Sequence, residues 1–229
     1  IDGLHSKGVI PVLVGGTGLY IDSLINNIEF SVASVDDECR KKLFALSESK
    51  GADYLHSLLE EADPVSAQKI HKNNIIRVIR ALEIINTTGL TLEQINANSI
   101  RERKYQPIFV GLNFRDRAKL YERIDKRVDI MIENGLINEA KKLYSLELSS
   151  TSRAAIGYKE LAPYFNGEKS LEDCLESLKI ETRHYAKRQL TWFRKNENIN
   201  WFYPDDYENT ADMYSEVLSM INDFLKEVH

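Results

Sequence analysis

A glycine-rich turn near the N-terminus has the residue types of a ligand-binding loop. The segment GGTGLY begins at Gly15, directly after the apolar run VIPVLV that starts at Val9. Such a run predicts a buried strand, and the glycines predict the turn that ends it. A helix is expected from Thr17, whose hydroxyl and neighbouring backbone N–H groups could face a phosphate or a base. An ordinary tight turn with Thr17 as the N-cap would have the same sequence, which is neither a Walker A loop nor a GxGxxG fingerprint.

Two segments rich in Lys and Arg contain no acidic residue. They are KIHKNNIIRVIR, from Lys69 to Arg80, and RHYAKRQLTWFRK, from Arg183 to Lys195. The formal net charge of -5 argues weakly against nucleic-acid binding, because Lys and Arg provide most contacts to a phosphate backbone. Basic segments within an acidic chain weaken that argument, although solvated helix faces have the same composition.

The first basic segment predicts a helix with one charged face. Arg77 and Arg80 are three positions apart and share a face, with Lys69 and Lys72 just upstream. The buried face is predicted to consist of Ile75, Val78, Ile79 and Leu82. This ridge could contact RNA phosphates, which position a ligand without specifying its sequence. Alternatively, it is an ordinary amphipathic helix with surface arginines.

The second basic segment combines cations, an amide and an aromatic ring within about two helical turns. These residues are Lys187, Arg188, Gln189, Trp192 and Arg194. Aromatic and guanidinium planes stack on splayed RNA bases, and amides read base edges. Trp192 and Phe193 could instead be core residues, and for Phe193 the core is the expected place.

Other candidate groups carry weaker chemical signals. Arg115, Arg117, Arg123 and Arg127 follow a predicted strand and could clamp phosphate oxygens, or could pair with Asp116, Glu122 and Asp125. The five histidines and two cysteines lack the spacing of metal ligands, so no metal site is predicted.

The order of elements predicts an α/β core that is interrupted by a helical block. Residues 35–91 show only helical periods, whereas PIFVGLNF at 107–114 predicts a second strand. A long helical pattern broken at Gly135 follows, then helices over 170–195 and from Thr210, with a short strand in NINWFYP between them. We therefore expect a parallel-sheet core formed by residues 1–33 and 105–229, and an all-helical insertion domain at 34–104.

Composition is typical of a soluble globular protein. The chain has 229 residues, of which 43% are hydrophobic, so it can bury a core. No apolar run approaches the ~20 residues that a membrane span needs, and no signal peptide is recognisable. Two cysteines suit a reducing compartment, so a cytoplasmic protein is expected.

Four ordered motifs resemble those of the tRNA dimethylallyltransferase family. They are PVLVGGTGLYIDSL, IHKNNIIRVIRALEIINTTG, AAIGYKEL and TRHYAKRQLTWFRKN. The resemblance runs through the whole chain, and it implies a P-loop NTPase-like parallel-sheet core, incomplete at the N-terminus, with a helical insertion. The family's phosphate loop and general-base Asp lie upstream of GGTGLY and are not in this sequence, so we expect this chain alone to be inactive.

The resemblance also implies roles for particular residues. Thr17 is the catalytic candidate, near the diphosphate or the target amine, and Gly15, Gly16, Arg115 and Arg117 are candidates for binding diphosphate. Contacts with tRNA are implied for Arg40, Ile76, Arg77, Arg80, Gly157, Tyr158, Lys159, Lys187, Arg188, Gln189, Trp192 and Arg194. The family often has Arg or Gln where this chain has Ala154. Arg153 is adjacent, but a shift of one helical position rotates a side chain by about 100°.

The implied reaction moves a dimethylallyl group from dimethylallyl diphosphate to N6 of the adenosine beside the anticodon, at position 37 of tRNA. The implied partners are the anticodon stem-loop and the prenyl donor, with Mg²⁺ bound by ligands outside this chain, and a monomer is expected. One alternative is a P-loop small-molecule kinase or adenylate prenyltransferase. A second alternative is a noncatalytic RNA-binding module.

Overall fold

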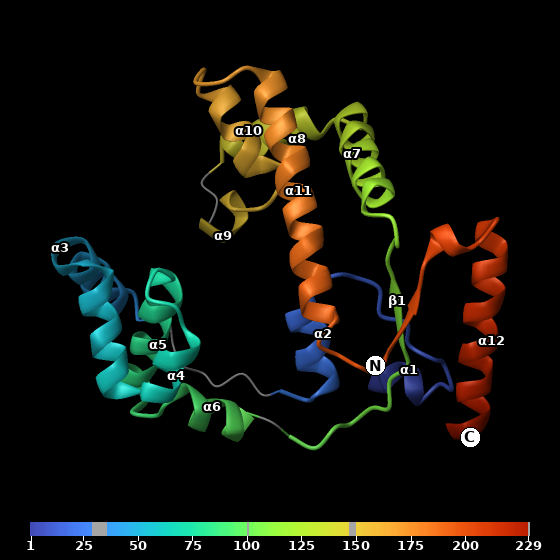
Figure 1. The fold of residues 1–229 in the computed structure, drawn as a ribbon, viewed down its shortest axis with the longest axis horizontal. Coiled ribbons are helices and arrows are strands. Elements are labelled where there is room, and N and C mark those ends of the chain that lie inside the picture. The colour runs from blue at the N-terminus through green and yellow to red at the C-terminus, as the bar shows by residue number, and fades with distance from the viewer. Residues whose placement is uncertain (29–35, 100, 147–149, 229) are drawn as a thin grey trace. The chain divides into compact units, whose positions relative to one another are not determined.

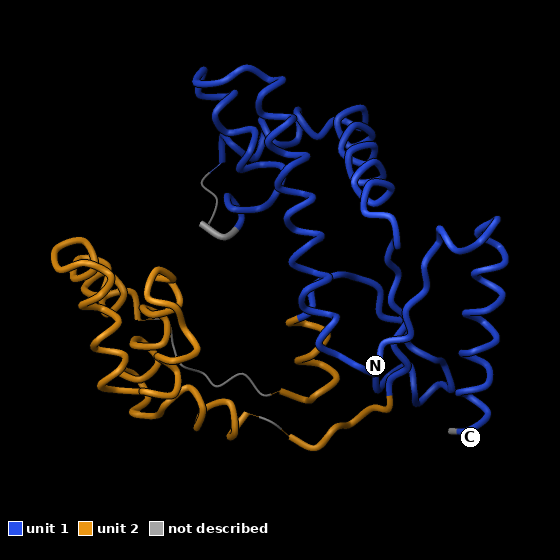
Figure 2. Tube along the Cα trace, in the orientation of Figure 1, with its two compact units in different colours: residues 1–18, 107–229 blue, residues 19–106 orange. Residues whose placement is uncertain are grey.

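A computed structural model describes residues 1–28, 36–99, 101–146 and 150–228. The chain divides into two compact units, one formed by residues 1–18 and 107–229 and the other by residues 19–106 (Figure 2). The predicted boundary between residues 33 and 34 lies outside the described residues. Each unit is described by itself below.

The unit of residues 19–106 is built from helices, as its periodicity predicts. Its elements are α2 (Gly18–Ile25), which begins at the unit boundary, α3 (Asp37–Ala62), α4 (Pro64–Lys69), α5 (Ile75–Thr88) and α6 (Leu92–Ser99) (Figure 1). Apolar residues of α3, α4 and α5 form one core, with Leu55, Leu59 and Val78 fully buried. Gly89 ends α5 in the left-handed conformation, which glycine adopts at little cost. The helical prediction for this region is confirmed.

A buried carboxylate joins three of these helices. Asp63 follows α3 and caps α4, and its Oδ1 accepts a hydrogen bond from the Ser66 backbone N–H at 3.0 Å. Its Oδ2 accepts from the Ser66 hydroxyl at 2.6 Å and from the N–H of Leu92, the first residue of α6, at 3.1 Å. Asp63 thus satisfies backbone donors at the starts of two helices.

The other unit contains a small parallel sheet. Strand β1 (Phe109–Leu112) pairs with β2 (Ile199–Phe202) in parallel, with Phe109 opposite Ile199 and Leu112 opposite Phe202. Both strands lie in segments predicted as strands, so those two predictions are confirmed. The sheet and a majority of helices make an α/β fold.

Four helices of this unit form its hydrophobic core, which is separate from the core of the other unit. They are α7 (Arg117–Glu133), α8 (Leu136–Tyr144), α10 (Tyr158–Phe165) and α11 (Leu171–Phe193), and their buried residues include Val128, Leu161 and Leu178. Gly135, with φ 97°, separates α7 from α8 where the pattern predicts a break. Ion pairs of 2.7 Å from Arg183 to Asp125 and from Lys179 to Asp129 join α11 to α7.

Four further elements in the described residues complete this unit. They are α1 (Asp2–His5), α9 (Ser150–Arg153), the 3-10 turn η1 (Pro204–Asp206) and α12 (Thr210–Val228). The predicted terminal helix from Thr210 is confirmed, and its Met213 is buried. None of the helices in the described ranges combines the length and hydrophobicity that a membrane span requires.

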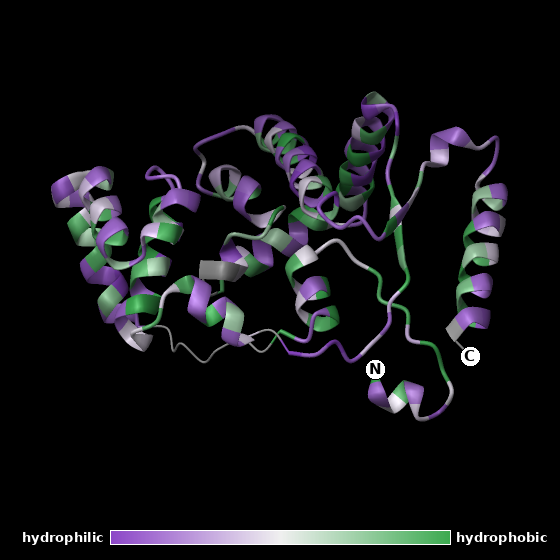
Figure 3. Ribbon diagram, turned by 60° about the horizontal axis from the view of Figure 1, so that its bottom comes forward, coloured by the Kyte–Doolittle hydropathy of each residue, from purple (hydrophilic) through white to green (hydrophobic). Residues whose placement is uncertain are grey.

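The prediction of a buried strand from Val9 is wrong. Residues 9–14 form no regular element, although Figure 3 colours the segment that follows α1 as hydrophobic. Val12 and Val14 are 80% and 92% exposed. A strand needs a neighbour to satisfy its backbone groups, and the described sheet consists of β1 and β2 alone. Hydrophobicity here therefore produces neither pairing nor burial.

Candidate functional site

The glycine turn packs against the second basic segment, so two motifs far apart in sequence meet within one unit. Gln189, on α11, donates a hydrogen bond from Nε2 to the Gly16 carbonyl at 2.9 Å. A Cβ on Gly16 would lie 2.0 Å from that nitrogen, and a Cβ on Gly18 would lie 2.2 Å from Cδ1 of Trp192. Both side chains therefore occupy space that a Cβ on the facing glycine would fill.

Thr17 lies between these two contacts. It is exposed and directly precedes α2, in the place of an N-cap residue, where the sequence predicts it. The amide of Gln189 and the indole of Trp192 flank the turn through its glycines. Thr17 is thus the residue between the two glycines that Gln189 and Trp192 contact, and hydroxyl, amide and aromatic groups can bind a nucleobase or a phosphate.

The cations of the same α11 segment are accessible. Lys187, Arg188 and Arg194 are exposed, and Trp192 keeps 40% of its surface exposed. The Arg188 guanidinium lies 5.7 Å from the Tyr185 ring centroid, and Lys195 Nζ lies 5.9 Å from that of Trp192. Phe193 is partly buried. The segment thus presents positive charge beside aromatic rings, the combination that binds single-stranded RNA.

In the other unit, the predicted basic ridge on α5 is altered by carboxylates. Arg77 and Ile76 are exposed, as an RNA contact requires, but Lys72 pairs with Asp53 at 2.6 Å. Arg80 turns to Glu83, with Nη1 2.8 Å from Oε2. The ridge therefore consists of cations that are partly paired within the protein.

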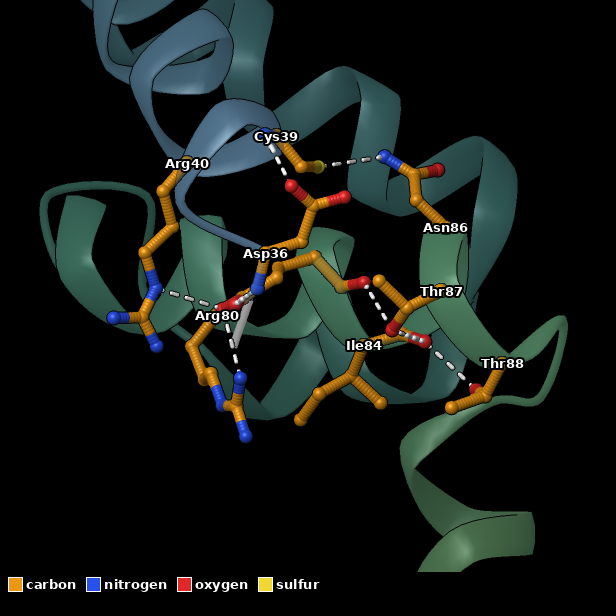
Figure 4. Close-up of polar contacts among 9 residues, drawn as sticks. Asp36, Cys39, Arg40, Arg80, Ile84, Asn86, Thr87 and Thr88 are labelled. Carbon is orange, nitrogen blue, oxygen red and sulfur yellow. Dashed lines mark hydrogen bonds and ion pairs between the residues drawn. The ribbon is translucent and has the colours of Figure 1, made fainter. Parts of the chain in front are cut away.

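Glu83 also binds Arg40, a predicted tRNA contact from a distant part of the sequence. Arg40 Nε donates a hydrogen bond to Oε2 of Glu83 at 2.9 Å (Figure 4). Burial by itself raises the pKa of Glu83, but Arg80, Arg40 and the Asp36 N–H outweigh it and hold the pKa below its usual value. Sequence reasoning missed Glu83, although it is the sole carboxylate of α5.

The third motif forms the start of α10. Gly157 is its N-cap with φ 103°, and its N–H donates to Oε2 of Glu160 at 2.8 Å. The Tyr158 hydroxyl donates to Glu139 at 2.5 Å, and this hydrogen bond, with burial, raises the pKa of Tyr158. Lys159 is exposed, as are Arg153 and Ala154. Among the tRNA contacts predicted in this motif, Lys159 is the residue that presents a positive charge at the surface.

The arginines proposed as a phosphate clamp follow β1. Both carboxylate oxygens of Asp206 accept from Arg115 Nε at 2.7 Å, and the Arg115 guanidinium lies 4.0 Å from the Tyr203 ring centroid. Arg117 is exposed at the first position of α7. Arg115 is thus paired with a carboxylate that sequence reasoning did not consider, and Asp125 pairs with Arg183 instead.

Comparison with known proteins relates these motifs to one family. Residues 1–196 match the family model described as IPP transferase. The tRNA dimethylallyltransferase of Acetivibrio thermocellus is 47% identical over 215 residues, which cover 91% of this chain and 67% of that protein. The corresponding enzyme of Clostridioides difficile is 43% identical over 225 residues, covering 97% and 72%.

Solved structures agree with the sequence comparison. The tRNA isopentenylpyrophosphate transferase of Bacillus halodurans is 41% identical with a TM-score of 0.66, and the match covers 99% of this chain and 70% of that one. A eukaryotic dimethylallyltransferase acting on tRNA is 28% identical with a TM-score of 0.73, covering 99% and 59%. The resemblance inferred from four motifs is thereby confirmed, and the chain belongs to the IPP transferase family of tRNA dimethylallyltransferases.

Proposed function

We propose that this protein transfers a dimethylallyl group from dimethylallyl diphosphate to N6 of the adenosine beside the anticodon of tRNA. Family membership supports this reaction, and one contact in the structure supports the location of the site at the glycine turn. That contact is the seating of Gln189 and Trp192 on Gly16 and Gly18, which puts an RNA-type recognition segment against the turn that carries Thr17. A kinase or adenylate prenyltransferase would not need this basic, aromatic helix face.

The reaction exchanges a carbon–oxygen bond of the donor for a carbon–nitrogen bond to the acceptor. The N6 amine attacks the allylic carbon, the carbon–oxygen bond to diphosphate breaks, and N6 loses a proton. An exocyclic purine amine is a weak nucleophile, so its orientation and the stabilisation of the leaving diphosphate dominate catalysis. In this proposal the Thr17 hydroxyl orients the amine or a diphosphate oxygen, and no residue of this sequence is assigned as the base.

Diphosphate binding is proposed for the backbone of Gly15 and Gly16 and for Arg117. Arg115 is proposed to join through its terminal guanidinium nitrogens, because its hydrogen bonds to Asp206 use Nε and its side chain is 61% exposed. Mg²⁺, when bound, would neutralise charge on the diphosphate. Within the described residues no group of three His, Cys, Asp or Glu side chains could hold a metal, so no step here depends on Mg²⁺. The P-loop NTPase-like core likewise remains part of the proposal.

Recognition of tRNA is proposed for the basic residues of both units. Removing a base from the RNA stack costs a few kcal/mol, which contacts to the backbone must offset. Arg77, Lys159, Lys187, Arg188 and Arg194 are exposed cations suited to phosphates. Gln189 and Trp192 are suited to the base, because amides read base edges and indoles stack on them.

The test compares RNA and nucleotide acceptors in the full-length protein. Prenyl transfer to an anticodon stem-loop and to AMP is followed by mass spectrometry, and we expect transfer to the RNA alone. Lys187→Glu should weaken stem-loop binding at least tenfold, since a phosphate contact becomes a repulsion. Lys126→Glu, an exposed change on α7, is the matched control and should have little effect.

Other outcomes would decide against the proposal. Preference for AMP would indicate an adenylate prenyltransferase, and RNA binding without any prenyl transfer would indicate a noncatalytic module. Equal binding by Lys187→Glu and the unaltered protein would remove the α11 segment from the interface.

A further inference from the structure

Glu83 is a charged residue at a buried position of α5 where an apolar residue would be expected. Its side chain is 0% exposed, and it lies on the α5 face that also carries the core residues Ile79 and Leu82. Burying an ion pair costs several kcal/mol per ion in lost hydration, so an apolar side chain of similar size is often equally stable. Stability therefore does not explain why a carboxylate is here.

The contacts of Glu83 show what the carboxylate does. Its Oε1 accepts a hydrogen bond at 3.0 Å from the backbone N–H of Asp36, the N-cap of α3. Its Oε2 accepts from Arg40 Nε at 2.9 Å and lies 2.8 Å from Arg80 Nη1, as an ion pair without hydrogen-bond alignment (Figure 4). One buried group thus fixes arginines from the first turn of α3 and from α5.

Both arginines remain able to bind an anion. Their side chains are 35% and 38% exposed, so the buried carboxylate holds one side of each guanidinium while the other part is at the surface. A guanidinium has five N–H donors, and Glu83 engages Nε of Arg40 and Nη1 of Arg80. Two cations share one anion, so the group keeps a net charge of about +1 at neutral pH.

We propose that Glu83 is a positioning residue that fixes Arg40 and Arg80 as one preset pair of phosphate-binding groups. The inference rests on the proposed tRNA function, which supplies the phosphates. An unpaired arginine loses much rotamer freedom when it binds, and a residue that has already fixed the side chain reduces that cost. The planar guanidinium then meets phosphate oxygens in a defined orientation.

Glu83→Gln separates positioning from simple electrostatics, because the two predict opposite signs. The substitution removes a negative charge beside two arginines, so electrostatics alone predicts tighter RNA binding. If Glu83 positions the arginines, binding weakens instead, by about tenfold for the loss of aligned charged contacts. The measurement is stem-loop affinity of the full-length protein at fixed salt. Glu61→Gln removes an exposed charge from α3 as the matched control, and it should leave affinity unchanged or slightly tighter.

A double-substitution cycle tests whether Glu83 acts through the arginines. In an Arg40→Ala, Arg80→Ala background, Glu83→Gln should cause no further loss of affinity. Continued loss in that background would indicate a general structural role and overturn the inference. Steady-state kinetics should show a raised KM for tRNA, with kcat and the KM for dimethylallyl diphosphate unchanged.

Arg40→Lys keeps the test decisive if Glu83→Gln fails to fold. Lysine preserves the charge at a partly exposed position but lacks the planar group, so we expect several-fold weaker binding. Unchanged affinity would show that charge without orientation suffices and would refute the proposal. Failure of the unaltered protein to bind the stem-loop would instead refute the proposed function, so the two failures are distinguishable.

Discussion

At the scale of single residues, the glycines of the GGTGLY turn allow two side chains of α11 to pack against its backbone. Gly16 and Gly18 provide the space that Gln189 and Trp192 occupy, and the Gly16 carbonyl accepts a hydrogen bond from Gln189. The two positions differ in tolerance, because the end of a glutamine side chain can rotate away whereas an indole ring requires a larger displacement. The contact between the turn and α11 should therefore depend more on Gly18.

We expect Gly18→Ala to destabilise the protein by about 1–3 kcal/mol, the usual cost of overpacking. The new Cβ would lie 2.2 Å from Trp192 Cδ1. Gly16→Ala should cost less, since the atoms that its Cβ meets belong to the mobile end of Gln189. Urea unfolding followed by tryptophan fluorescence measures both variants. Equal destabilisation would contradict the assignment of Trp192 as the rigid partner.

At the scale of elements, the ionised carboxylate of Asp63 accepts hydrogen bonds from the first turns of α4 and α6. Burial raises the pKa of Asp63, but the hydrogen bonds from Ser66 and Leu92 outweigh burial and hold that pKa below its usual value. Because the pKa of Asp63 is lower in the folded chain than in the unfolded chain, where it is about 3.9, the ionised carboxylate stabilises the fold at a pH above 3.9. This stabilisation is lost as the pH falls through the folded-state pKa.

Asp63→Asn should accordingly destabilise the protein in a pH-dependent way. At pH 7 we expect a loss of about 1–3 kcal/mol, because charged hydrogen bonds are replaced by neutral ones and one acceptor becomes a donor. The difference from the unaltered protein should shrink as the pH falls below ~4, because Asp63 of the unfolded chain then becomes protonated while the folded-state carboxylate, with its lowered pKa, still resists protonation. Unfolding free energies from pH 3 to 7 measure this, and a difference that is constant with pH would contradict it.

Sequence patterns predicted the elements better than the contacts between them. The helices between residues 36 and 88, the break at Gly135 and both paired strands follow from local periodicity and glycine placement. The segment at 9–14 could not be predicted correctly, because strand formation depends on a partner that local sequence does not specify.

The candidate site shows the same division. The residue types of the glycine turn and of the α11 segment were recognisable, but their contact spans 173 positions and needed the structure. Glu83 lies on an apolar helix face, where a single carboxylate is a weak signal. Its partner Arg40 is 43 positions away, so its role became visible only from the folded chain.

At the scale of the whole molecule, each compact unit has its own hydrophobic core. One core includes Leu55 and Leu59, the other includes Leu161 and Leu178, and the two clusters share no residue. Stability in such a chain is a property of each unit, and a single unfolding free energy describes it poorly.

We expect core truncations to act within their own unit. Leu59→Ala and Leu161→Ala should each remove about 2–5 kcal/mol of stability by leaving a cavity. Hydrogen exchange by mass spectrometry should show faster exchange in α3 and α5 for the first variant and in α10 and α11 for the second. Faster exchange throughout the chain for either variant would contradict this division.

The pairing of β1 with β2 has a consequence for biosynthesis. Asn200 Nδ2 donates to the Phe109 carbonyl from 91 positions away. Ribosomes add about 5–20 residues per second, so β1 waits roughly 5–20 s for its partner to be made. Throughout that interval β1, which carries the exposed Val110 and Leu112, lacks the pairing with β2 seen in the folded chain. Chaperone capture and misassembly should therefore concentrate on this stretch of the growing polypeptide.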